Sequence, residues 1–214
     1  DLFYGYMCQR MAQNYYPMFL YRNREREALD NPFMELGSTL GPEDDPFDEA
    51  SYIRFKGNDY SPDRMFDEIK GFVNENRDEE FFLMWTTTLP HAAFQAPDEM
   101  VDYYVKKFAD EYGVSETPVY NGKGYFPCRY PKATYAAMIT YFDQQIGKLI
   151  DELKRLGIYD NTIIMFTSDN GPHSEGGADP QFFNKNGELR GIKRSMHEGG
   201  IRVPFIAYWK GRIA

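Results

Sequence analysis

The chain has 214 residues, of which 42% are hydrophobic and 17% aromatic, a composition that argues against intrinsic disorder. Its formal net charge of -9 at pH 7 disfavours nucleic acid as a partner, because a polyanion is held by clustered Lys and Arg side chains. No apolar run approaches the roughly 20 residues that a membrane-spanning helix needs. We therefore expect a globular protein without a membrane span, and we predict no particular oligomeric state.

The first sixty residues carry few signals of regular structure. Residues 30–62 combine Pro, Gly and acidic residues without periodicity, which indicates a long surface connection.

The two cysteines, Cys8 and Cys128, are too few for a disulfide scaffold and lack a metal-binding spacing. They could pair with each other or remain buried thiols. No basic start followed by an apolar stretch is readable at the beginning of the chain, so no secretory leader is predicted within it.

A helix and a strand are predicted next. The helix begins at Ser61, a suitable N-cap, with Pro62 in the first helical position. Residues 81–88 are apolar, aromatic and β-branched and stop before Pro90, which predicts a buried strand.

Two more helices and two more strands follow. Apolar residues recur at helical spacing over 97–112 and over 133–156, and a glycine stands after each segment. The apolar runs 162–168 and 202–209 predict strands. Helices that alternate with non-alternating apolar strands indicate an α/β fold, with a mostly parallel sheet and helices on both faces.

Polar residues stand at the ends of two predicted strands. Asp169 and Asn170 directly follow the strand 162–168, and in α/β sheets ligands gather at the carboxyl ends of strands. A carboxylate and an amide oxygen suit a hard cation such as calcium or magnesium. The alternative is an ordinary Asp-Asn-Gly turn.

Three histidines and one lysine complete the set of candidates. His91 follows the predicted strand 81–88, where an imidazole could contact an anion or give a proton to a leaving group, or could be a plain loop residue. Lys193 lies in a glycine-flanked segment that could direct its ammonium at an anion, although a surface lysine is the alternative. His173 and His197 lie near these motifs and are weaker candidates.

Several motifs together resemble a known family. They are "TLPHAAFQAP", the run from "YAAMITYF" to "TIIMFTSDNGPHSEGG", and "LRGIKRSMHEGGIRVPFIAYW", with "FYGYMCQRMAQNYYPMFLYRN" near the start. In this order they resemble the type I sulfatases of the alkaline-phosphatase superfamily. The resemblance spans most of residues 81–214 and implies an alkaline-phosphatase-like fold that is incomplete in this chain.

The resemblance implies a role for each of four residues. Asp169 and Asn170 would be two ligands of a calcium ion that neutralises the sulfate and the nucleophile. Lys193 would hold a sulfate oxygen. His91 would contact the sulfate and stabilise or protonate the departing alcohol. A cation, an ammonium and an imidazole would lie close together because each stabilises the negative charge that builds up on the sulfate oxygens and on the oxygen of the departing alcohol.

The family's nucleophile is not readable in the sequence. Sulfatases use a formylglycine made from Cys or Ser in the pattern Cys/Ser-x-Pro/Ala-x-Arg, and neither "CQRMA" nor "CRYPK" fits it. We therefore expect residues 1–214 to be the central part of a single sulfatase catalytic domain, without the N-terminal nucleophile segment and the C-terminal portion. This part alone is expected to be inactive, with an incomplete calcium site.

The resemblance implies a parent protein that is an exported sulfuric ester hydrolase, located in a periplasm, outside the cell or in a lysosome. Its substrate would be a sulfated sugar or glycan, or an aryl sulfate ester. Two alternatives remain open. One is hydrolysis of phosphate or phosphonate esters, as in related members of the superfamily, and the other is a non-catalytic module that binds a sulfated ligand.

Overall fold

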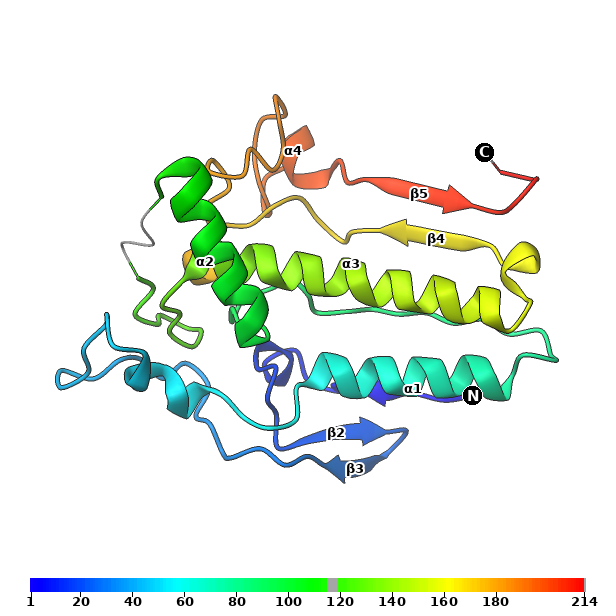
Figure 1. The fold of residues 1–214 in the computed structure, drawn as a ribbon, viewed down its shortest axis with the longest axis horizontal. Helices are drawn as coiled ribbons and strands as arrows, with labels where there is room; N and C mark the ends of the chain where they lie inside the picture. The colour runs from blue at the N-terminus through cyan, green and yellow to red at the C-terminus, as the bar shows by residue number, and fades with distance from the viewer. Residues whose placement is uncertain (115–118, 214) are drawn as a thin grey trace.

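The computed structural model describes residues 1–114 and 119–213 and shows long helices lying beside extended strands (Figure 1). The helices are α1 (Ser61–Glu75), α2 (Asp98–Tyr112), α3 (Pro131–Arg155) and the single turn α4 (Glu198–Ile201). The strands are β1 (Tyr4–Gly5), β2 (Phe19–Arg22), β3 (Glu25–Ala28), β4 (Ile164–Thr167) and β5 (Phe205–Tyr208). No helix in this described part is long and apolar enough to cross a membrane.

The three long helices confirm the predictions from periodicity and differ only near their ends. Helix α2 ends at Tyr112 and is capped by Gly113, which has a left-handed φ of 61° and whose N–H donates to the carbonyl of Ala109 at 3.1 Å. Pro62 lies in the first turn of α1 as expected. The predicted capping role of Ser61 is wrong, because its hydroxyl pairs with the Tyr6 hydroxyl at 2.7 Å instead.

The region predicted as a surface connection contributes to the core. Within residues 30–62, a short 3-10 helix over Glu49–Phe55 buries Tyr52 and Phe55. Tyr60 is buried as well, and its hydroxyl donates to the carbonyl of Gln95 at 2.9 Å. Aromatic rings bury large apolar areas, so these side chains hold the connection against the core despite its polar composition.

Residues 81–88 are extended but form no strand, which corrects the prediction of a buried strand. Trp85 packs between Phe66 of α1 and Phe142 of α3, with ring centroids 5.8 and 5.2 Å apart respectively. On the opposite side Phe82 and Met84 are 85% and 72% exposed. The apolar run therefore has one covered face, although its composition indicated two.

Every strand pair in the described ranges is antiparallel, so the mostly parallel sheet predicted from the sequence is not found there. The strands β1, β2 and β3 form one sheet, and β4 pairs with β5 in another. Between β4 and β5 the chain forms loops and the single turn α4, without a long crossover helix, and such a connection returns the chain in the opposite direction.

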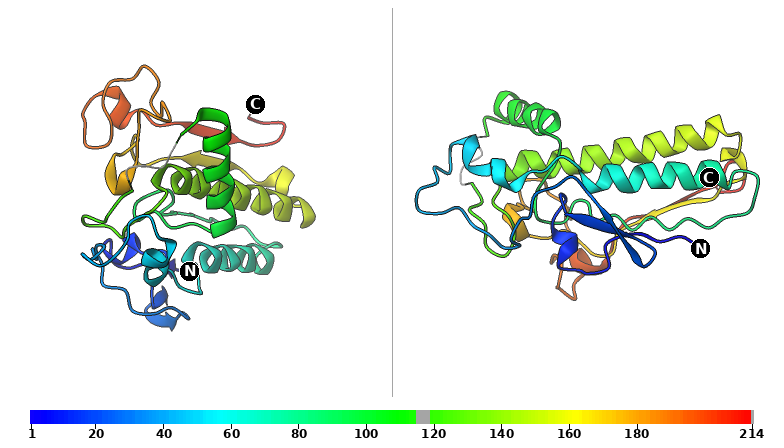
Figure 2. Two further views of the ribbon diagram at one scale, coloured as in Figure 1. Left: turned by 60° about the vertical axis from the view of Figure 1, so that its left-hand side comes forward. Right: turned by 90° about the horizontal axis from the view of Figure 1, so that it is seen from below.

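The long helices α1 and α3 lie on one face of the β4–β5 pair. The sequence had predicted helices on both faces of the sheet. The views in Figure 2 show α1 and α3 side by side, with β4 and β5 alongside them. Phe166 of β4 packs against Phe142 of α3, whereas the neighbouring Met165 is 61% exposed. The α/β class is confirmed, with small sheets rather than one large sheet.

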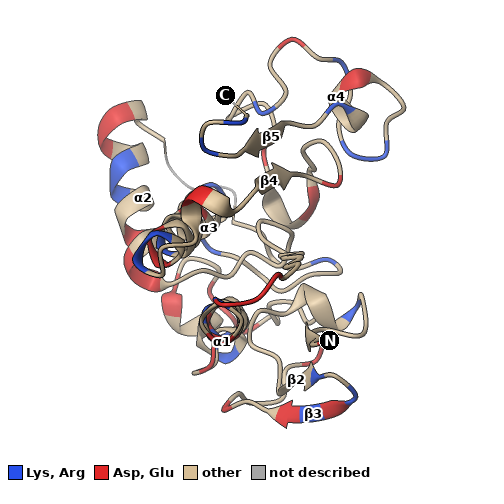
Figure 3. Cartoon of the chain, turned by 90° about the vertical axis from the view of Figure 1, so that its right-hand side faces the viewer, with Lys and Arg blue, Asp and Glu red and all other residues tan. Residues whose placement is uncertain are grey.

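Charged residues of both signs are interspersed on the surface of the described part. Figure 3 shows acidic segments beside basic ones on α2 and on the β2–β3 hairpin. On α2 the ion pair between Lys107 and Glu111 spans one helical turn, with a distance of 2.5 Å between nitrogen and oxygen. The expectation that the protein does not bind nucleic acid stays a prediction.

A close backbone contact joins the loop after β4 to α4. The N–H of Gly171 donates to the carbonyl of Gly200 at 3.0 Å, and a Cβ at position 171 would lie 1.9 Å from the carbonyl oxygen of Gly199. Next to it, the N–H of Lys193 donates to the carbonyl of Pro172 at 2.8 Å. Only glycine at position 171 permits the close approach to α4. Together, the two hydrogen bonds tie the end of β4 to α4 and to the segment that carries Lys193.

Substituting Gly171 with Ala should therefore destabilise the protein by about 2 kcal/mol, because the methyl group forces two backbone segments apart. The matched control is Gly147→Ala on the exposed side of α3, where nothing lies within 4 Å of the added Cβ. That change should stabilise by about 1 kcal/mol, since Ala favours the helix over Gly. Urea denaturation of both variants measures this, and equal changes in the unfolding free energy would contradict the account.

Candidate functional site

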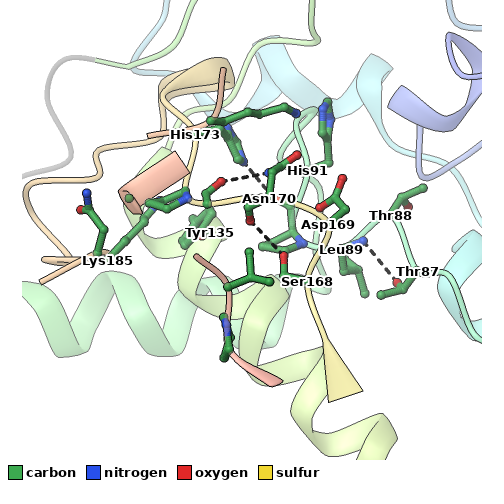
Figure 4. A pocket seen from close by; sticks show the side chains of 18 of the residues that line it. Thr87, Thr88, Leu89, His91, Tyr135, Ser168, Asp169, Asn170, His173 and Lys185 are labelled. Atoms are coloured by element: carbon green, nitrogen blue, oxygen red, sulfur yellow. Dashed lines mark hydrogen bonds between the residues drawn. The ribbon is translucent and has the colours of Figure 1, made fainter. Parts of the chain in front are cut away.

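A cavity of about 850 Å³ brings the four predicted site residues together (Figure 4). His91, Asp169, Asn170 and Lys193 all line it, although they come from three separate segments of the chain. Other segments supply further lining residues, among them Gln9, Gln13, Thr87, Thr88, Tyr135, His173 and Lys185. The structure thus confirms that the four residues share one place, and their chemical roles stay predictions.

Backbone contacts fix the position of His91. The Tyr15 hydroxyl, which is fully buried with its ring, lies within hydrogen-bonding distance of the carbonyls of Thr88 and His91, at 2.8 and 2.9 Å. The Nδ1 atom of His91 lies 2.5 Å from the carbonyl oxygen of Ala92, which accepts a hydrogen bond from it. The ring therefore keeps Nε2 as the nitrogen that can exchange a proton with a ligand.

Asp169 and Asn170 present oxygens of the kind that calcium binds. The Asp169 carboxylate has neither an ion-pair nor a hydrogen-bond partner within residues 1–114 and 119–213. Asn170 donates from Nδ2 to the carbonyl of Gly171 at 2.9 Å, which leaves its Oδ1 available as a ligand.

These two residues fit a part of a calcium site. Calcium takes six to eight oxygen ligands, and two neighbouring side chains supply only some of them. The described residues contain no group of three or more His, Cys, Asp or Glu side chains that could hold a metal ion. Further ligands would have to come from water, from the substrate or from another part of the protein.

Glu175 contacts two basic side chains and one histidine, and Lys193 and His173 among them line the cavity. Its carboxylate lies 3.9 Å from Nζ of Lys193 and 2.5 Å from Nη1 of Arg194. Nδ1 of His173 lies 3.4 Å from the same carboxylate. Because the Glu175 side chain is only 15% exposed, this attraction is weakly screened and holds the Lys193 ammonium in place.

His173 lies nearer the centre of the site than the sequence indicated. It is 7% exposed, and its ring stacks on that of His91 with centroids 5.6 Å apart. Burial lowers the pKa of His173 to about 4, and the nearby Lys185 and His91 add to this effect. Contacts with Glu175 and with the Pro90 carbonyl act in the opposite direction without overcoming it. His173 is therefore neutral near pH 7 and supports the His91 ring.

Several lining residues were not predicted. Tyr135 follows the helical spacing of α3 and so resembles an ordinary core residue, and Lys185 lies in the loop sequence "NKNG". Gln9 and Gln13 come from the N-terminal segment. The two cysteines do not pair with each other: Cys8 is exposed, contrary to the expectation of a buried thiol, and Cys128 is buried, with its Sγ 3.4 Å from Oγ1 of Thr134.

The neutral His173 predicts a loss of stability in acid. Its pKa in the folded state, about 4, lies below the ordinary value of 6.5, so the unfolded chain binds the proton first as the pH falls. The stability present above pH 6.5 should decline by up to about 3 kcal/mol between pH 6.5 and 4.

A His173→Asn variant should lose less stability over that pH range, as measured by urea denaturation at a series of pH values. The matched control is His197→Gln, which changes an exposed histidine and should keep the slope of the wild type. If the unfolding free energy of the wild type and of His173→Asn depended on pH in the same way, His173 would not be the cause of the loss of stability in acid.

Comparison with known proteins places the chain in a family. The family model described as sulfatase matches residues 5–214. An N-acetylgalactosamine-6-O-sulfatase of Bacteroides thetaiotaomicron is 30% identical over 157 residues, which is 71% of this chain and 26% of the relative. The uncharacterized sulfatase YdeN of Escherichia coli is 30% identical over 156 residues, 72% of this chain and 24% of the relative. The chain thus spans about a quarter of the length of these two relatives.

Solved structures agree with the sequence matches. The crystal structure of Ps i-CgsB in complex with k-i-k-neocarrahexaose has a TM-score of 0.61 and 25% identity to this chain. The match covers 91% of this chain and 32% of that one. Together with the match to the family model, this agreement shows that the chain belongs to the sulfatase family.

Proposed function

We propose that the protein containing this chain hydrolyses a sulfate ester in the cavity lined by His91, Asp169, Asn170 and Lys193. The convergence of these four side chains, in a chain of the sulfatase family, is the observation that carries the proposal. A cation-binding pair, an ammonium and an imidazole around one cavity are the groups that stabilise an oxyanion and a departing alkoxide.

Lys193 and His91 have distinct parts in this proposal. The Lys193 ammonium, oriented by Glu175, contacts a sulfate oxygen and stabilises the negative charge that builds up there. His91, whose Nδ1–H donates to the Ala92 carbonyl, acts as an imidazolium: it gives the proton on Nε2 to the departing alcohol and is left as the neutral ring. His173 packs against the His91 ring and keeps its orientation.

A calcium ion fits the two oxygen ligands at the end of β4. Asp169 and Asn170 would hold it, and when bound it would supply positive charge that polarises the sulfate. Neither Cys8 nor Cys128 lines the cavity, so neither is proposed as the nucleophile. We propose that a formylglycine outside these 214 residues fills that role, and that this chain alone is inactive.

A sulfated sugar or glycan is the proposed substrate class. One relative is named an N-acetylgalactosamine-6-O-sulfatase, and one related structure was solved in complex with k-i-k-neocarrahexaose. The cavity volume of about 850 Å³ lies in the range of sites that hold small ligands, which supports a saccharide rather than the sulfate group alone.

The test is release of sulfate from sulfated saccharides and from a model aryl sulfate by the complete protein that contains this chain. Lys193→Met and His91→Asn should each lower kcat/KM by roughly 100-fold or more, because each removes a group that acts on the transition state. Lys148→Met, which changes an exposed lysine of α3, should retain full activity. Removal of calcium with a chelator should abolish turnover.

A phosphate ester and a phosphonate ester are included as alternative substrates. Preferential cleavage of these compounds would contradict sulfate specificity. Failure to release sulfate from every compound would contradict the proposed activity itself.

A further inference from the structure

Lys185 borders the same cavity with a buried ammonium that no anion neutralises. Its Nζ atom has no hydrogen-bond partner in the described part of the chain, and no ion pair within 4.0 Å involves it there. The atom lies 3.3 Å from the centroid of the Tyr135 ring and 5.3 Å from that of Phe183. Ring faces attract a cation but replace only part of its lost hydration. A buried charge of this kind calls for a specific partner.

The two carboxylates of the preceding loop, those of Glu175 and Asp179, are engaged elsewhere. Asp179 attracts Lys185 electrostatically, but its carboxylate accepts hydrogen bonds from the backbone N–H groups of Gln181 and Phe182 at 3.1 and 2.9 Å. Glu175 is engaged by Lys193 and the neighbouring arginine. Desolvation lowers the pKa of Lys185 to about 8, and the attraction of Asp179 does not restore it.

Hydrogen bonds within the loop connect Lys185 to the segment that carries Lys193. The N–H of Lys185 donates to the carbonyl of Pro180 at 3.2 Å. The neighbouring Asn186 donates from Nδ2 to the carbonyls of Leu189 and Gly191, at 2.7 and 2.6 Å. Figure 4 shows Lys185 and Tyr135 among the residues around the cavity that also holds His91 and Asn170. Two ammonium groups on connected loops therefore border one cavity, and only one of them has a carboxylate partner.

We propose that Lys185 binds a second anionic group of the substrate, a carboxylate or a further sulfate, beside the sulfate that His91 and Lys193 contact. This inference rests on the proposed function and narrows the substrate class to saccharides with at least two anionic groups. An anion at Lys185 would supply the countercharge that the protein does not provide.

The kinetic test uses the complete protein and three substrates: a neutral sugar with one sulfate, the same sugar with two sulfates, and a sulfated uronate. Lys185→Met removes the charge and keeps an apolar side chain over Tyr135. It should raise KM for the two-anion substrates by about tenfold or more and change KM for the singly sulfated sugar less than about twofold. Lys185→Arg should retain most of the affinity, and Lys123→Met, at an exposed lysine, should match the wild type.

The two-anion substrate that loses affinity in Lys185→Met identifies the bound group as a carboxylate or a sulfate. Equal losses for all three substrates would overturn the inference, because Lys185 would then act on the cleaved sulfate or on stability. Unchanged KM for every substrate would overturn it as well.

Calorimetric binding of the same three saccharides to chelator-treated protein separates this inference from the proposed function. Binding of a two-anion saccharide that is weaker by about tenfold in Lys185→Met supports the inference even if no sulfate is released. Sulfate release combined with unchanged binding would refute the role of Lys185 alone. Absence of both release and binding would refute both proposals.

Discussion

The site depends on the close backbone contact of Gly171 with Gly199 and Gly200. The apolar strand β4 ends on Asp169 and Asn170, and the contact at the next residue holds this end against the loop that carries Lys193. A larger residue at position 171 would separate the proposed cation ligands from the proposed sulfate-binding lysine. Gly171, which follows Asp169 and Asn170, therefore permits a close contact between two backbone segments, which an ordinary turn would not require.

Charge around the cavity differs from the charge of the chain as a whole. The chain carries a formal net charge of -9, yet Lys185 and Lys193 both line the cavity, and Arg194 shares the Glu175 carboxylate with Lys193. Such a local arrangement attracts a small anion without creating a basic surface for a polyanion. The low exposure of Glu175 and Lys193 strengthens their mutual attraction, because the surrounding medium has a lower dielectric constant than water.

Local patterns in the sequence predicted the helices well because helical periodicity reflects which side of each helix is buried. The same patterns misjudged residues 81–88, whose apolar composition fits a doubly covered strand although Phe82 and Met84 are exposed here. The antiparallel pairing of β4 with β5 depends on the path of the loop between them, which composition does not specify.

The candidate site was predicted in part. His91, Asp169, Asn170 and Lys193 stand in motifs that resemble sulfatases, and the structure places them together. Tyr135 and Lys185 gave no such signal, because a helical core tyrosine and a loop lysine acquire their positions only through tertiary contacts.

The most direct test of the account is a crystal structure of the complete protein with calcium and a sulfated saccharide. The account predicts a cation about 2.3–2.6 Å from a carboxylate oxygen of Asp169 and from Oδ1 of Asn170. It also predicts sulfate oxygens within hydrogen-bonding distance of Nζ of Lys193 and Nε2 of His91. A sulfate group bound outside this cavity, or a calcium ion that does not contact Asp169 and Asn170, would contradict it.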